Sequence, residues 1–100
     1  MLQITNIEPV YDQYGHLVAM NVRVKNAGDK NIKATVAVYV TRLISKGRFS
    51  KKEEHGSSEP VVIDLAPGAE HTLEMIIHPA ISVAKNFTIS VVGSMEIPTA

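Results

Sequence analysis

Histidine and methionine occur twice at a spacing of four residues, a pairing that could bind a metal ion. The pairs are His16 with Met20 and His71 with Met75. Imidazole and thioether groups together suit Cu(I). In an extended strand, however, residues i and i+4 lie ~13 Å apart at ~3.3 Å per residue, so one ion cannot bridge them. Because the chain also lacks cysteine, the sequence predicts no metal site and no cofactor.

The carboxylates and hydroxyls of the chain do not form a catalytic pattern. Acid–base catalysis needs two carboxyl groups that face one cleft and differ in pKa, and the spacing of Asp64, Glu70 and Glu74 does not indicate such a pair. Two serines follow His55 closely, but a nucleophile also needs a strained turn and a third residue that orients the base. We therefore predict no catalytic residues, and we expect that the chain is not an enzyme.

A basic segment between residues 42 and 52 could bind an anionic polymer such as a glycan or nucleic acid. Its cations are Arg42, Lys46, Arg48, Lys51 and Lys52. Glu53 and Glu54 follow directly and weaken the positive field, and Phe49 alone is a small surface for stacking. Charged side chains also keep an edge strand from pairing with other chains, which favours a solvated loop or an edge hairpin over a binding segment.

The overall charge and hydropathy of the chain exclude several classes of partner. Ten basic and ten acidic residues give a formal net charge of zero, so no overall field attracts nucleic acid or an anionic membrane. No apolar run approaches the ~18 residues of a membrane span, and the first residues lack the pattern of a signal peptide. The absence of cysteine suits a cytoplasmic protein as well as many surface proteins. Asn86-Phe87-Thr88 is a sequon for N-glycosylation, which favours an extracellular or cell-surface location for a chain whose signal or anchor is not part of it.

Short strands separated by turn residues are predicted along the whole chain. Apolar residues alternate with polar ones in several segments, which is typical of strands with one buried face. We expect strands at about 2–8, 16–25, 31–43, 61–65, 69–78 and 86–93. Six or seven strands at intervals of roughly ten residues favour one all-β domain over residues 1–100, a two-sheet antiparallel sandwich.

The connections between these strands carry their own expectations. Asn26 and Gly28 are interpreted as turn residues that tolerate a left-handed backbone, and Pro67-Gly68 as a chain reversal in which Gly68 is free to adopt a positive φ. The polar residues 45–59 are expected to form a long exposed connection. A short edge strand around Phe49 could lie within it. Pro79 is expected to end the fifth strand.

Three segments of the chain resemble the CARDB family. They are Val-Arg-Val-Lys-Asn-Ala-Gly at 22–28, residues 34–40, and Ile-Asp-Leu-Ala-Pro-Gly at 63–68 leading into the next strand. CARDB domains are immunoglobulin-like, adhesion-related domains of bacterial and archaeal surface proteins. The soluble domains of archaellum stator subunits and pilin-like proteins are a second, similar group. The resemblance, which spans residues 18–93, implies an immunoglobulin-like sandwich that takes part in cell adhesion or filament assembly.

The resemblance ends before the last strand of the family. CARDB-like domains continue into a further strand after the one that 86–93 resembles, and here only residues 94–100 remain. Unless these residues cover it, the backbone edge along 86–93 would be free to accept a strand from another copy or another protein.

Tyr39, Ile76 and Val92 fall in the outward phase of their predicted strands and form the candidate interface. Apolar side chains gathered on one face are typical of a contact surface. We therefore predict a non-catalytic structural or adhesive module that contacts a protein partner or a second copy, for example as a homodimer. The alternative is a small sandwich that binds carbohydrate or an anionic polymer through the loops at 11–15 and 42–52. Because the chain has no tryptophan, Tyr11 and Tyr14, which flank Asp12, would have to stack on a sugar ring.

Overall fold

The computed structural model describes the backbone of residues 1–46, 50–82 and 87–96, and the side chains of residues 1–42 and 53–82. The described part of the chain folds into seven strands, which confirms the all-β class and the predicted strand number. The strands are β1 (Leu2–Tyr11), β2 (His16–Asn26), β3 (Ile32–Lys46), β4 (Ser50–Ser57), β5 (Val61–Leu65), β6 (Glu70–Ser82) and β7 (Phe87–Glu96). In these ranges there is no helix with the length and apolar character that crossing a membrane requires.

All strand pairs are antiparallel. β2 lies between β1 and β6. β3 pairs with β5 along its first half, with β4 along its second half, and with β7 along its other edge. A single bridge between Ser57 and His78 connects β4 to β6 and so joins the two groups of strands. The pairing is therefore one connected network, and the division into two sheets stays a prediction.

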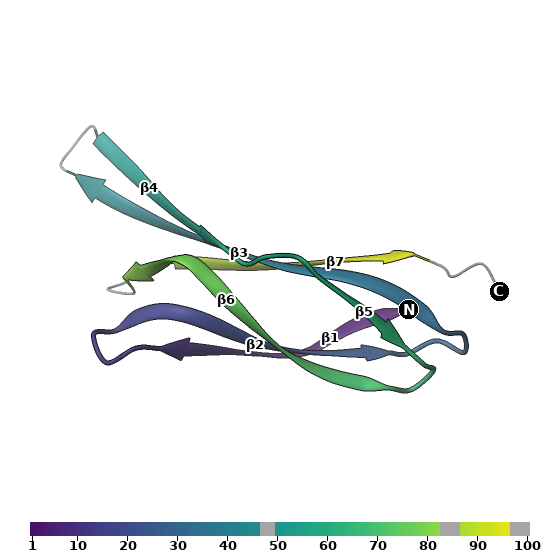
Figure 1. Cartoon of the computed structure of the whole chain (residues 1–100). Coiled ribbons are helices and arrows are strands. Elements are labelled where there is room, and N and C mark those ends of the chain that lie inside the picture. Colours follow the sequence, from purple (N-terminus) through teal and green to yellow (C-terminus); the bar gives the residue numbers. More distant parts are fainter. Residues whose placement is uncertain (47–49, 83–86, 97–100) are drawn as a thin grey trace.

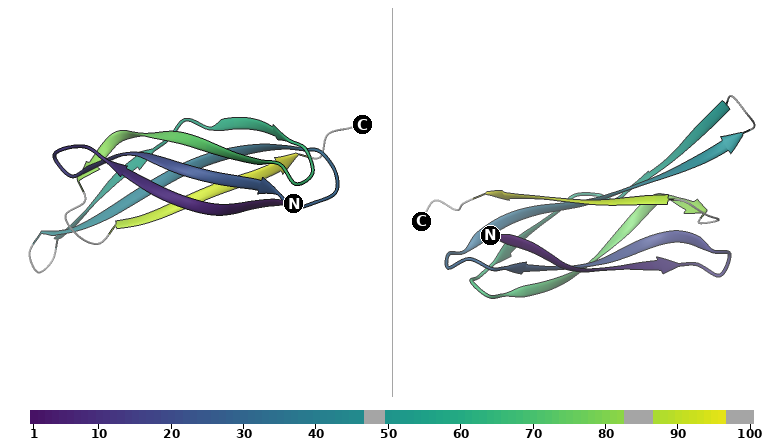
Figure 2. Two further views of the ribbon diagram at one scale, coloured as in Figure 1. Left: turned by 90° about the horizontal axis from the view of Figure 1, so that it is seen from below. Right: turned by 180° about the vertical axis from the view of Figure 1, so that it is seen from behind.

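The two groups of strands lie in different layers of the molecule. Figure 1 shows β3 and β7 above β1 and β2, with β6 running obliquely beside them. The second half of β3 and its partner β4 extend as a hairpin away from these layers, as both side views show (Figures 1 and 2).

Alternation of apolar and polar residues along the strands produces the core. The predicted inward residues of β3 are all buried, and so are those in the second half of β2. Together with residues of β5 and β6 they form one cluster, whose largest members are Leu17, Met20, Val22, Val24, Val36, Val38, Val40, Leu65, Met75, Ile77 and Ile81. Full burial of such a side chain contributes about 1.5–3 kcal/mol, so this cluster is the main stabilising feature of the fold.

The prediction of a long exposed connection at 45–59 was wrong, whereas the alternative of a hairpin at the basic segment 42–52 is confirmed. β3 continues to Lys46 and β4 covers Ser50–Ser57, so the segment forms a β-hairpin; Phe49 lies outside the described residues. A strand with one buried face normally alternates apolar and polar residues, and the charged residues of β4 lack this alternation. A hairpin that extends into solvent does not need it, because both of its faces can be polar. Sequence alternation alone therefore misses β4 and the last residues of β3.

The prediction that Pro79 ends its strand was also wrong. β6 runs on to Ser82, and the His78–Pro79 peptide bond is cis. The ladder between β2 and β6 is interrupted at this point, with Ala19 paired to Ile76 and Leu17 paired to Ile81. Proline lacks a backbone N–H and is tolerated where a strand has such an irregularity, so the strand passes through it.

Glycine conformations agree with one turn prediction and correct another. Gly68 has a φ of 77° in the turn between β5 and β6, as predicted, and Gly15 has the same value between β1 and β2. Gly28 does not have a positive φ. A Cβ atom there would instead lie 2.7 Å from the backbone nitrogen of Met1, so the position needs glycine because the N-terminus approaches closely. Asn26 is not a turn residue either, because it is the last residue of β2.

Candidate interaction surface

Tyr39 and Ile76 lie on one outer surface of the strand network. Their exposed fractions are 49% and 44%. Tyr39 is opposite Ser57 in the β3–β4 ladder, and Ser57 is opposite His78 of β6. Residues that are directly opposite share a face, and so do residues two apart on a strand. Ile76 lies two residues before His78 and therefore shares its face. Tyr39 and Ile76 thus lie on one continuous face, separated by the strand β4.

Val92 takes a neighbouring register position on the other side of β3. It is opposite Ala37, while Ser90 is opposite Tyr39. Val92 is therefore at the diagonal position across from Tyr39, a separation of about 7–8 Å between backbones. The side chain of Val92 lies outside the described residues. The register thus brings the three predicted interface positions to one side of β6, β4, β3 and β7.

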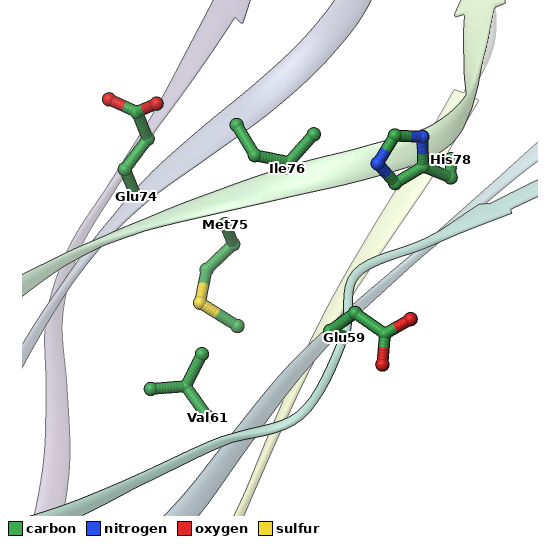
Figure 3. A pocket seen from close by; sticks show the side chains of 6 residues that line it. All are labelled: Glu59, Val61, Glu74, Met75, Ile76 and His78. Carbon is green, nitrogen blue, oxygen red and sulfur yellow. The ribbon is translucent and has the colours of Figure 1, made fainter.

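A shallow groove of about 270 Å³ adjoins this surface, between β6 and the segment that leads from β4 into β5. It is lined by Glu59, Val61, Glu74, Met75, Ile76 and His78. In Figure 3, Met75 and Val61 approach each other between the two strands, whereas Ile76 lies on the other side of the β6 ribbon. Small-molecule sites are usually deeper and range from about 300 to 1,000 Å³, so the groove suits contact with another surface better than enclosure of a ligand.

The methionines of the possible copper pairs belong to the core. Met20 and Met75 are fully buried opposite each other in the β2–β6 ladder. His71 is exposed and opposite Val24, nearer the other end of that ladder. Within the described ranges, no three histidine or carboxylate side chains are grouped closely enough to hold a metal ion.

Ser58 forms two hydrogen bonds with the backbone of β3. Its backbone N–H donates to Val38 O at 2.9 Å, and its hydroxyl oxygen accepts a hydrogen bond from Val38 N at 2.9 Å. The nearby His55 is exposed, with Nε2 3.3 Å from Glu53 Oε2 and Nδ1 3.4 Å from the Thr41 hydroxyl. The serine is thus buried against β3, and the histidine contacts residues of the hairpin.

The basic segment forms part of the β3–β4 hairpin. Arg42 is opposite Glu54, and its guanidinium nitrogen lies 3.6 Å from Glu54 Oε2. This contact partly neutralises the first of the five predicted cations. The other four, Lys46, Arg48, Lys51 and Lys52, have side chains outside the described residues, so anion binding by the segment stays a prediction.

The turn between β1 and β2 is organised by Asp12. Its Oδ1 accepts hydrogen bonds from Tyr14 N at 2.8 Å and His16 N at 2.9 Å, and its Oδ2 lies 3.4 Å from His16 Nδ1. The hydrogen bond from the His16 backbone, together with that from Tyr14, lowers the pKa of Asp12 below its usual value. The carboxylate therefore stabilises its own turn. Tyr11 and Tyr14 remain exposed beside it.

Sequence patterns did not reveal the role of Asn26 in connecting the strands. Asn26 is fully buried, and its amide donates to Lys30 O at 2.7 Å and to Leu65 O at 3.0 Å. Its Oδ1 accepts from Gly28 N at 3.0 Å and lies 3.4 Å from the N-terminal amine. A turn after the second strand was predicted, but nothing in the sequence indicated that the side chain of Asn26 would reach β5.

Comparisons with known proteins leave the family open. No protein-family model matches the chain, and no curated protein matches it. The sequon residue Asn86 lies outside the described part of the structure. The resemblance to CARDB domains and the glycosylation of Asn86 therefore stay predictions.

Proposed function

We propose that this chain is a non-catalytic structural or adhesive module that acts by protein–protein contact in a cell-surface or filament assembly. The observation that carries the proposal is the exposure of Tyr39 and Ile76 on one continuous outer face, next to the shallow groove beside β6. Exposed apolar residues that share a face indicate a contact surface. Exposed apolar residues that are scattered singly over a protein do not.

The proposed architecture is an immunoglobulin-like two-sheet sandwich. One sheet would hold β1, β2 and β6, and the other β3, β4, β5 and β7. A single bridge between Ser57 and His78 connects these groups, and both contribute buried side chains to one core, which supports this division. The resemblance to CARDB domains and to archaellum stator or pilin-like subunits supports a location outside the cell.

Carbohydrate binding is a second candidate, favoured by two exposed tyrosines, Tyr11 at the end of β1 and Tyr14 in the turn that follows. Tyr14 is 75% exposed, and Tyr11 is close to it in sequence. Aromatic side chains that combine an apolar ring with a polar tip suit contact with sugars. The adjacent carboxylate of Asp12 is occupied by hydrogen bonds within the turn, which leaves this site with little additional polar chemistry.

Substitution of Ile76 by lysine tests the proposed face. We expect Ile76→Lys to weaken self-association at least tenfold while the circular-dichroism spectrum stays that of a β protein. Tyr14→Lys is the control, because Tyr14 is also a large exposed side chain but lies in the turn between β1 and β2 and not on β3, β4 or β6. Equal association of both variants and the unmodified chain would remove the Tyr39–Ile76 face from consideration. Binding to a glycan array by a chain that remains monomeric would favour the carbohydrate candidate.

A further inference from the structure

The free strand edges of the fold differ in how well they are protected against pairing with other chains. Among the described strands, β1, β5 and β7 pair along one edge only, while β4 and β6 have a second partner only at the Ser57–His78 bridge. Natural sheets protect such edges with charges, proline, bulges or short strands. At each of these edges other than that of β7, at least one such protection lies within the strand. In β7 the single charge is its last residue.

The protection of the other edges is visible in their residues and register. β1 contains Pro9 and two register shifts, and β5 has only five residues, one of them Asp64. β4 and β6 carry several charged residues.

β7 has none of this protection along its first nine residues. Its ladder with β3 covers ten residues without a register shift, contains no proline, and has a single charged residue, Glu96, at its end. Its valine, isoleucine, threonine and phenylalanine residues favour extended structure. An unprotected edge of this length offers a row of backbone N–H and C=O groups to another strand.

β1 provides a second, independent observation on the same side of the molecule. Ile4 and Ile7 are opposite Val24 and Val22, which are fully buried, so the two isoleucines are directed toward the core side of the strand. They are nevertheless 37% and 42% exposed, which means that the other layer does not cover them. In Figure 2 (left), β1 and β7 run along the same long side, and Figure 1 shows them in different layers.

We propose that β7 pairs antiparallel with β7 of a second copy of this chain about a twofold axis. This inference rests on the proposed function, because it names the partner and the strand of one protein contact. A second copy fits because it offers the same uncharged edge, and because a net charge of zero gives no repulsion between copies. The pairing would continue the β3–β7 ladder into the partner and bring the two β1 strands together, so that Ile4 and Ile7 of both copies become covered.

Cysteine cross-linking tests the strand and its symmetry directly. The chain has no cysteine, so any disulfide-linked dimer must join the introduced residue to its copy. In a twofold antiparallel pair, one central residue is opposite itself at a Cα separation of about 4.5–5.5 Å, which a disulfide can bridge. We expect either Val91→Cys or Val92→Cys to give a covalent dimer on mild oxidation. Thr88→Cys should not, because it would lie roughly 20 Å from its copy.

Two lysine variants measure the contribution of the edge in solution. Ser94→Lys adds a charge to β7, and Ile7→Lys adds one to the apolar residues of β1; each should weaken the dimer at least tenfold in sedimentation equilibrium. Val62→Lys is the control for the edge, because Val62 lies on β5 and not on β7 or β1, and it should leave the β7 dimer unchanged. Normal β-type circular dichroism would show that the variants fold.

The outcomes separate this inference from the proposed function. A monomer at all concentrations, or cross-linking along β7 no greater than that of Val62→Cys, would overturn the β7 dimer. If the chain still associates without cross-linking along β7, and Ile76→Lys weakens that association, protein contact through the Tyr39–Ile76 face stands and only the β7 pairing fails. A covalent dimer at Val91 or Val92 that Ser94→Lys weakens would support the pairing even if Ile76→Lys has no effect.

Discussion

The side-chain amide of Asn26 donates a hydrogen bond of 3.0 Å to the carbonyl oxygen of Leu65, 39 residues away in the chain. Backbone hydrogen bonds continue this connection, since Asn26 N donates to Ala69 O at 3.0 Å and Gly68 N donates to Asn26 O at 2.8 Å. One buried residue thus fixes the end of β2 to the turn between β5 and β6. This relationship holds together strands that belong to different layers of the molecule.

Asn26→Ala should lower the free energy of unfolding by about 3 kcal/mol, because the buried Leu65 carbonyl and two part-buried backbone groups would lose their partners at once. Urea denaturation followed by circular dichroism measures the change. Asn31→Ala is a suitable control, since Asn31 is exposed in the following turn, and its effect should stay within about 0.5 kcal/mol. Equal stability of the two variants would show that the Asn26 side chain does not connect the strands.

Gly56→Ala should destabilise the fold by about 1–3 kcal/mol through overpacking. A Cβ atom at Gly56 would lie 2.8 Å from the carbonyl oxygen of Pro79 and 2.8 Å from a methyl carbon of Ile77. The close approach of β4 to β6 therefore requires glycine at this position. Thermal unfolding compared with Ser57→Ala, an exposed neighbour, is the measurement; a change no larger than that of the control would contradict the close approach.

Asp12 should titrate below the ordinary aspartate value of 3.8, because its carboxylate accepts backbone hydrogen bonds from His16 and Tyr14. A pKa that is lower in the folded state than in the unfolded chain stabilises the fold above the unfolded value, and the contribution disappears as the pH falls through the folded value. NMR titration of the Asp12 side chain measures the pKa, and Asp12→Asn should flatten this part of the acid unfolding curve. A pKa at or above 3.8 would contradict the turn geometry.

The unmodified chain should pass a heparin column without retention at low salt. Arg42 is already paired with Glu54, and Glu53 precedes Glu54 in β4. These carboxylates weaken the attraction of the hairpin for an anionic polymer. Retention at low salt that is lost when Lys46, Arg48 and Lys51 are neutralised would instead establish an anion-binding segment.

Much of the fold was predictable because its strands alternate clearly. In β3, every second residue from Ile32 to Val40 is apolar and buried, so a period of two was sufficient to place the strand and its inner face. β4 could not be found this way, since its charged residues have no apolar alternation. Continuation of β6 through Pro79 depends on an interruption of the β2–β6 ladder, which only the tertiary pairing reveals.

The candidate site was predictable only in part. Strand phase correctly predicted that Tyr39 and Ile76 are exposed. That they share a face depends on the bridge between Ser57 and His78, and contacts between residues distant in sequence leave no local pattern. The exposure of Ile4 and Ile7 could not be predicted either. It depends on which strands of the other layer cover β1, and the residues of β1 do not indicate this.

The solution mass of the unmodified chain, measured by light scattering over a concentration series, tests the central claim most directly. The account predicts a mass that rises with concentration toward a defined dimer or a larger assembly. A mass that remains that of one chain at the highest concentrations, in a sample that binds sugars on a glycan array, would contradict a module that acts by protein–protein contact.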